Sequence, residues 1–286
     1  MFFDPKIDYA FKRVFATAAG KKRLCSLLNS FLKLTGKNEI KSLEVKNGEA
    51  LSGTPLGKLA IFDVHCEDKN GHKFIVEMQN RSYPDLHKRA GMYVARCYAD
   101  QLKKGKNYKE LKPVVLIAFL SEPSNQIPYG SDIIRSHLIT EQETGNILMH
   151  DMKWYYAYIG NFRKKESELS NLLEHWFYFL TQAPLLSKPP KSAPPEVADA
   201  YHEMEQSTWS DAARLAYDES ILAMMDDESK QTDSFNKGKV EGKVEGKAEG
   251  ELMERIRIAK SMKASGVDNK IITDTTKLSL KEIQDL

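Results

Sequence analysis

The sequence predicts an α/β domain with a mixed sheet, followed by a helical extension at the C-terminus. Two runs rich in alternating apolar residues flank Asn70-Gly71, a pattern typical of an antiparallel hairpin. The run Val114–Leu120 is apolar at every position, as expected for a central strand with both faces covered. A helical pattern separates the hairpin from this run, so a crossover joins them and the sheet is mixed.

The elements can be assigned in order along the chain. Helical spacing of apolar residues predicts one helix through Tyr9 and Phe15 and a second from Leu24 to Leu32. We then expect strands over 42–46, 58–67 and 73–81, a helix over 84–104 and a strand over 114–120. Further strands or an extended excursion are expected over 133–139 and 154–159, before a helix over 169–180.

The composition changes after the last of these helices. Five of the eleven prolines lie between Pro184 and Pro195, which indicates either a domain boundary or a fixed crossing loop. A helical pattern follows over 198–225. We therefore divide the chain into a core, a proline-rich crossing and helical segment, a Gly-Lys-x-Glu repeat that is either helix or linker, and a small helical tail, over residues 1–183, 184–236, 237–252 and 253–286.

The four-residue repeat places like residues in stripes along a helix. Valines form one stripe, with lysines and glutamates on separate flanks. Glycines and like charges four residues apart make this segment a poor lone helix. It is therefore either a flexible linker or a helix that pairs with a second copy. Parallel pairing would set the lysine flank against the glutamate flank and predicts a homodimer through residues 237–260.

The tail is predicted to contain three short helices. The first covers 253–264 and is closed by Gly266, and the second covers 268–275. The third covers 280–286 behind the capping box Ser279-Leu-Lys-Glu282.

Composition and charge limit the classes of function. No apolar run approaches the about 20 residues that a membrane-spanning helix needs, and the N-terminus has no signal-peptide pattern, so we expect a cytoplasmic protein with no membrane contact. Three widely spaced cysteines indicate reduced core thiols. Residues 1–120 hold 22 Lys and Arg against 12 Asp and Glu, whereas the rest of the chain is acidic. The basic part either binds a polyanion or is simply solvated.

The hairpin can form in two registers, and burial selects one of them. A three-residue loop with Gly71 in a left-handed bulge pairs Phe62 with Met78, Val64 with Val76 and Cys66 with Phe74. Only this register makes one face wholly apolar. It sets Asp63 opposite Glu77 on the other face, with Gln79 two residues further along.

This second face has two interpretations. Alternating polar residues are normal on the solvated side of an antiparallel hairpin. Alternatively, the two carboxylates hold a cation, since they would repel each other about 5 Å apart across a strand pair. Mg²⁺ would suit Asp63, Glu77 and the carbonyl of Met78, with phosphate and water as further ligands.

The chain resembles a known family of nucleases. Asp63 and Glu77-Met78-Gln79 resemble the D...(D/E)xK signature of the PD-(D/E)XK superfamily. The arrangement is similar to that of the bacterial recombination-promoting nuclease and transposase family, whose pattern near the N-terminus stands here as Asp8-Tyr-Ala-Phe11-Lys12. The resemblance covers most of the chain and implies a restriction-endonuclease-like fold, with a mixed central sheet flanked by helices.

The resemblance also implies a function and a site. The expected activity is a Mg²⁺-dependent DNA endonuclease, with Mn²⁺ as a possible substitute, that promotes recombination or acts on mobile or foreign DNA. Asp63 and Glu77 would be its metal ligands, and Gln79 replaces the lysine of the signature. Asp8 is either a third acid or a helix cap, and Lys12 is either the missing cation or a solvated side chain. The rival is a catalytically silent protein that binds DNA and self-associates, and the sequence does not separate DNA from RNA.

A basic stripe follows the hairpin. Arg89, Arg96 and Lys103 are seven residues apart and line one face of the predicted helix over 84–104. They form either a rail for DNA phosphates or an ordinary solvated face. No base-reading motif is visible, so contacts to the DNA backbone are favoured over sequence recognition.

Overall fold

The computed structural model describes residues 1–46, 63–81, 84–102, 107–128 and 131–286. Contacts divide the chain into two compact units, Met1–Ile221 and Leu222–Leu286. The sheet lies in the first unit. None of the helices in the described ranges is long and apolar enough to cross a membrane.

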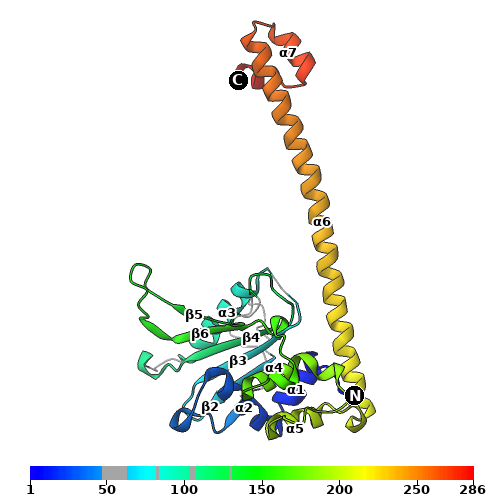
Figure 1. Ribbon diagram of the computed structural model, residues 1–286. Coiled ribbons are helices and arrows are strands. Elements are labelled where there is room, and N and C mark those ends of the chain that lie inside the picture. The colour runs from blue at the N-terminus through cyan, green and yellow to red at the C-terminus, as the bar shows by residue number, and fades with distance from the viewer. Residues whose placement is uncertain (47–62, 82–83, 103–106, 129–130) are drawn as a thin grey trace. The chain divides into compact units, whose positions relative to one another are not determined.

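The first unit is built on a mixed sheet of six strands in the order β1-β2-β3-β4-β6-β5 (Figure 1). Their bounds are Leu43–Lys46, Val64–Asp68, Lys73–Gln79, Val114–Leu120, Ile134–Ile139 and Met149–Ala157 for β1 to β6. β4 runs parallel to β3 and β6, and the other neighbours are antiparallel. The expected mixed α/β fold is confirmed. β6 begins earlier than the predicted 154–159 because β5 pairs along it.

The hairpin has the register selected by burial. Val64 pairs with Val76 and Cys66 with Phe74. Gly71 has φ +84°, the left-handed conformation that the three-residue loop requires. The predicted partner Phe62 lies outside the described residues. The hairpin therefore turns Glu77 to the face opposite the apolar set.

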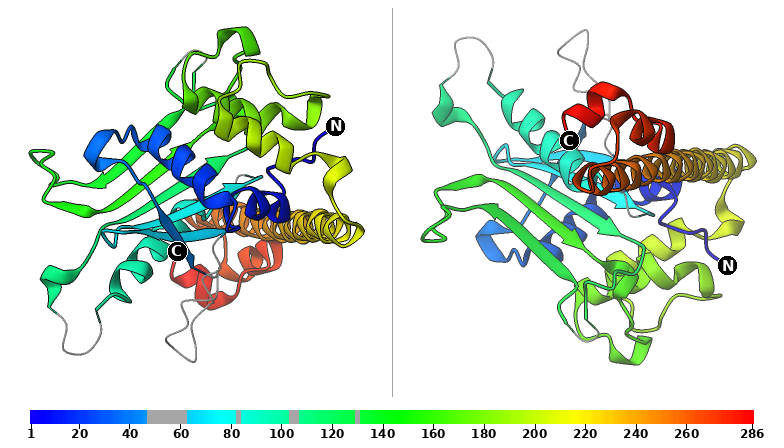
Figure 2. Two further views of the ribbon diagram at one scale, coloured as in Figure 1. Left: turned by 90° about the horizontal axis from the view of Figure 1, so that it is seen from below. Right: turned by 90° about the horizontal axis from the view of Figure 1, so that it is seen from above.

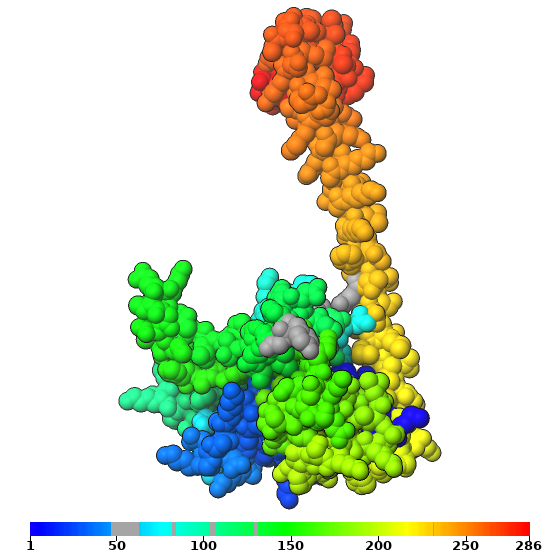
Figure 3. Space-filling model, viewed as in Figure 1, coloured from blue at the N-terminus to red at the C-terminus, as the bar shows by residue number. Residues whose placement is uncertain are grey.

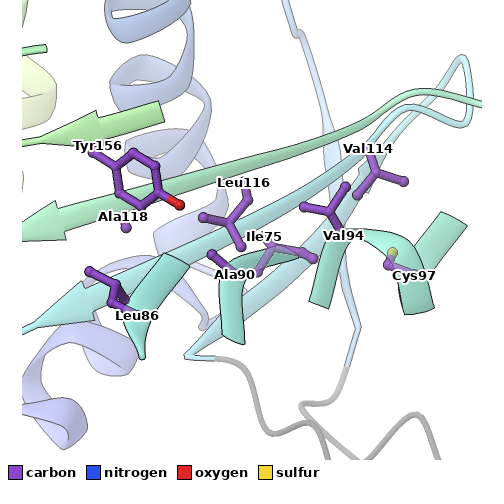
Figure 4. Packing of buried hydrophobic residues seen from close by; sticks show 9 residues of the cluster. All are labelled: Ile75, Leu86, Ala90, Val94, Cys97, Val114, Leu116, Ala118 and Tyr156. Atoms are coloured by element: carbon purple, nitrogen blue, oxygen red, sulfur yellow. The ribbon is translucent and has the colours of Figure 1, made fainter. Parts of the chain in front are cut away.

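One face of the sheet is covered by α3, Leu86–Ala99 (Figure 4). One side of this helix is buried against alternate residues of β3, β4 and β6, and the cluster comprises Ile75, Leu86, Ala90, Val94, Cys97, Val114, Leu116, Ala118 and Tyr156. Glu77 and Gln79 belong to the same face of β3 because they follow Ile75 at spacings of two. The helix therefore lies over the strand that carries the predicted site.

The opposite face packs on helices from both ends of the first unit (Figure 2). These are α1, α2, α4 and α5, at Asp8–Phe15, Gly20–Leu32, Leu172–Gln182 and Pro195–Glu203. Phe119 of β4 contacts Phe31 of α2 and Phe177 of α4, with ring centroids 5.7 and 6.4 Å apart. The aromatic layer explains why Val114–Leu120 is apolar on both faces.

The compact unit extends past residue 183 because α5 packs back onto the core. Arg23 of α2 is only 2% exposed and forms ion pairs with Asp199 and Glu203 of α5, at 2.8 and 3.3 Å. Its Nε also donates to the carbonyl of Val14. The proline-rich segment is therefore a crossing inside this unit.

The helical extension departs from the predicted bounds at two points. The pattern over 198–225 is broken between α5 and α6, and α6 then runs without interruption over Asp211–Ala264. The repeat and the first predicted tail helix are therefore parts of one helix. Along the repeat, Val240 and Val244 are 63% and 65% exposed, and no other part of the second unit covers this stretch (Figure 3).

The tail folds as a small cluster at the end of α6. Helices α7 and α8 span Asn269–Thr276 and Leu280–Gln284, close to prediction. The predicted capping box of Ser279 and Glu282 is present. Ala259, Ile272, Leu278 and Ile283 form its core, and Ile256 packs against them.

Candidate functional site

The polar residues of the hairpin gather at the carboxyl end of β3. Glu77 and Gln79 are only 6% and 7% exposed, because α3 covers their face of the sheet. Asp63 lies immediately before β2, opposite Glu77 in the hairpin register. The interpretation of this face as a solvated surface is therefore wrong for Glu77 and Gln79.

Asp63 is held by the backbone of the neighbouring strand. The N–H of Met78 donates to Asp63 Oδ2 at 2.6 Å. Burial raises the pKa of Asp63 to about 6, although this hydrogen bond opposes the shift, and the negative charge of Asp8 adds to it. Burial therefore disfavours the charge on Asp63 more than its donor compensates.

Glu77 is the more deeply buried of the two acids. Its Oε2 accepts a hydrogen bond from Gln79 Nε2 at 3.1 Å, whereas its buried Oε1 has no hydrogen-bond partner among the described residues. Burial, and then the charge of Asp63, raise the pKa of Glu77 well above its usual value. The surroundings of these two adjacent carboxyl groups therefore stabilise the ionised form of neither one.

Gln79 links these acids to helix α3. Arg89 Nη2 donates to Gln79 Oε1 at 2.9 Å, which orients the amide so that its nitrogen faces Glu77. Arg89 is therefore turned into the site. In the predicted stripe, Arg96 pairs instead with Asp100 at 3.1 Å, and Lys103 lies outside the described residues. The structure thus separates two arginines that the seven-residue spacing placed together.

Helix α1 brings a second pair of charges to the site. Asn80, just after β3, donates to the carbonyl of Lys6 at 2.7 Å and so fixes the start of α1 near the end of this strand. Asp8 and Lys12 form an ion pair at 2.8 Å, and both charges act on the pKa of Asp63. The N-cap of α1 is Ile7, so the alternative role of Asp8 as a helix cap is wrong.

Tyr93 of α3 also lies near the paired acids, although it was not among the predicted site residues. It follows Arg89 by one helical turn, and burial, then the charge of Glu77, raise the pKa of its hydroxyl. Tyr93 also packs against the apolar cluster between α3 and the sheet. Its spacing from Arg89 was the available signal.

The donor set suits a divalent cation held by two carboxylates. No group of three or more His, Cys, Asp or Glu side chains is placed to hold a metal ion in the described parts of the chain. The unpartnered Oε1 of Glu77 and the raised pKa values of Glu77 and Asp63 nevertheless indicate two acids that lack positive charge, despite Lys12 and Arg89 nearby. Hard cations prefer such oxygen ligands, so the residues present fit Mg²⁺.

The mixed sheet and its paired acids define a nuclease-like α/β protein. In comparisons with known proteins, residues 5–234 match the family described as PD-(D/E)XK nuclease family transposase. The chain belongs to this family, as its motifs had indicated. No curated protein and no solved structure gives a significant match.

Proposed function

We propose that this protein is a Mg²⁺-dependent DNA endonuclease that acts in recombination or on mobile or foreign DNA. Family membership gives it a nuclease-type role. The observation that supports catalysis is the buried Glu77, whose Oε1 has no hydrogen-bond partner among the described residues, next to the half-buried Asp63. Such a costly arrangement is expected where a cation is to be bound.

The residues of the site have separable roles in this proposal. Asp63, Glu77 and the carbonyl of Met78 would hold Mg²⁺, or Mn²⁺ in its place. The bound ion would supply an acidified water and stabilise charge on the phosphate. Gln79 lacks the charge of a lysine, so its amide orients the attacking water by hydrogen bonding, in a position fixed by Arg89.

Neighbouring side chains would take over the role of the lysine that Gln79 replaces, although they do not neutralise the two acids. Arg89 contacts Gln79 directly, and Lys12 lies close enough to lower the pKa of Asp63 and Glu77. Asp8 holds Lys12 by its ion pair and adds negative charge on the side of Asp63. Arg89 and Lys12 would supply the positive charge against which a scissile phosphate is held.

The proposal predicts nicked or linear product from supercoiled plasmid in Mg²⁺ or Mn²⁺, and none in EDTA. A labelled RNA of the same sequence in parallel reactions distinguishes a ribonuclease. The rival is a silent DNA-binding protein, and it is motivated by the absence of a lysine at Gln79. Salt-dependent DNA binding without metal-dependent product from either nucleic acid would support this rival.

We further propose that two copies pair through α6 at residues 237–260. The exposed stripe of Val240, Val244 and Leu252 would form the contact, with Lys and Glu flanks in complementary positions. Ile256 packs against the tail cluster, so the tail would support the end of the pair. A parallel pair would bring two nuclease cores to one DNA segment and lead from nicking to a double-strand break.

A further inference from the structure

A cavity lies on the face of the sheet that α3 covers, between α3 and strands β5 and β6. It has a volume of about 340 Å³ and is lined by His87, Gly91, His137, Trp154 and Tyr156. His87 and Gly91 come from α3, and the other three residues come from β5 and β6. Four of the five lining residues have aromatic rings, and none carries a permanent charge.

The rings are arranged around Tyr156. His87 and His137 meet the Tyr156 ring nearly edge-on, with centroids 4.6 and 5.2 Å away. Trp154 is fixed by its Nε1–H, which donates to the carbonyl of Ala90 in α3 at 3.0 Å. Tyr156 is 3% exposed. The cavity thus has a fixed floor, with the more exposed histidines at its sides.

Sheet register ties this cavity to the paired acids. Glu77 in β3 pairs with Ala118 in β4, and Ala118 pairs in turn with Tyr156 in β6. Residues paired in this way point to the same face. Because neighbouring strands lie about 4.8 Å apart, the backbone of Tyr156 is about 10 Å from that of Glu77. The cavity is therefore within reach of a nucleotide next to one bound at Glu77.

We propose that this cavity takes an unpaired nucleobase of the DNA strand whose phosphodiester lies at Asp63 and Glu77. This inference rests on the proposed function and assigns its substrate class, DNA with an unstacked base beside the scissile bond. Every nucleobase has a flat face that stacks on aromatic side chains. An enzyme that engages an extruded base holds it in such a pocket next to its site.

A metal ion is the competing occupant, since two histidines face the cavity. Their ring centroids are 6.4 Å apart. The one further donor in the lining is the Tyr156 hydroxyl, and burial raises its pKa to about 12, so it stays protonated at neutral pH. Two histidines without an anionic ligand make a poor metal site, which favours the base.

The test uses full-length protein and a DNA hairpin with one unpaired 2-aminopurine, moved stepwise along the strand. Without Mg²⁺, the wild type should change the fluorescence at one position. The double variant His87→Ala/His137→Ala should lose this change and bind the bulged hairpin about tenfold or more weakly. His87→Phe/His137→Phe keeps the rings but removes possible metal ligands, so it should retain both signals. His150→Ala is the control for loss of an exposed histidine outside the cavity.

The outcomes separate this inference from the proposed function. The nucleobase site would be overturned if the alanine double variant kept the fluorescence change and the affinity of the wild type. It would also be overturned if the phenylalanine double variant lost them. Neither outcome would contradict the proposed metal-dependent cleavage. Conversely, a position-specific 2-aminopurine signal with no cleavage of any substrate would reject the nuclease and retain the base site. Thermal melting of each variant confirms that it is folded.

Discussion

Glu77 carries a stability cost that only a ligand would offset. The residue is 6% exposed, and one of its carboxyl oxygens has no hydrogen-bond partner within the described ranges. The unfolded chain ionises this acid at neutral pH, whereas burial opposes its charge. Without a metal ion, folding must therefore either desolvate the charged Glu77 carboxylate or protonate it, and both cost free energy.

Replacing Glu77 by Gln should stabilise the metal-free protein while it abolishes cleavage. The amide removes the ionisable group, and we expect a gain of about 1 kcal/mol or more in the free energy of unfolding. Thermal and urea denaturation in EDTA at pH 7 measures this gain. Glu67→Gln is the matched control, because Glu67 is paired with Lys73 at 2.7 Å outside the site. Equal or lower stability of Glu77→Gln would show that the carboxyl is already satisfied.

His65 should make the protein less stable in acid. Burial, and then the charge of Lys73, lower its pKa to about 4, whereas a histidine in the unfolded chain titrates at about 6.5. As the pH falls, the unfolded state therefore binds a proton at His65 before the folded state does. The stability that His65 contributes is fully present above about pH 6.5 and is lost as the pH falls towards 4.

The measurement compares the wild type with His65→Gln. Asp63 and Glu77, whose pKa values are raised, affect both proteins equally, so their contribution to the pH dependence cancels in the difference. The difference in the free energy of unfolding should change by about 2 kcal/mol between pH 7 and pH 4. A difference that is independent of pH would contradict the assignment.

Among the elements, α3 joins the fold to the site. It buries its apolar side on three strands, and one of its flanks presents Arg89 and Tyr93 to the acids. The other flank lines the aromatic cavity. A change in the seating of this helix would therefore alter both places.

The two arginines of α3 should have different effects on the reaction. Arg89→Ala removes the hydrogen bond that orients Gln79 and a cation beside both acids, so cleavage should slow by about 10²-fold. Arg96→Ala is the matched variant on the same helix, and it should weaken DNA binding and its salt dependence with little effect on the rate at saturation. Rates and affinities measured across salt concentrations test this. Equal effects of the two variants would indicate that Arg89 only binds DNA phosphates, as the predicted stripe implies.

Local patterns predicted the elements better than the directions of their side chains. The hairpin register followed from the requirement for one apolar face, and the strand over 114–120 followed from its composition. The same patterns could not show that Arg89 turns inward, because a seven-residue spacing is shared by exposed and half-covered flanks. The position of α5 on the core involves long-range ion pairs of Arg23 with Asp199 and Glu203, which local periodicity does not contain.

At the scale of the whole molecule, the long helix α6 should determine assembly. Deleting residues 237–286 should give a monomer that still nicks plasmid but loses most double-strand cleavage, because one site cuts one strand. Light scattering and gel analysis of product measure the two effects. A monomeric full-length protein at micromolar concentration, or a dimer that survives the deletion, would remove the pairing model.

Charge reversal tests the direction of pairing. Changing Lys239, Lys243 and Lys247 to Glu should abolish association, since it sets acid against acid. Mixing this variant with one in which Glu241, Glu245 and Glu249 are Lys should restore a mixed dimer. Failure of this rescue would leave the repeat as an unpaired helix.

Asp63 and Glu77 should act together on a phosphodiester. The most direct test is the single-turnover rate of plasmid cleavage in Mg²⁺ for the wild type, Asp63→Ala, Glu77→Ala and the control Glu67→Gln. Each alanine variant should lose at least about 10³-fold, and the double variant little more, because residues that act as one unit are not additive. Glu67→Gln should cut at the wild-type rate. Cleavage that is unchanged in both alanine variants would contradict the site.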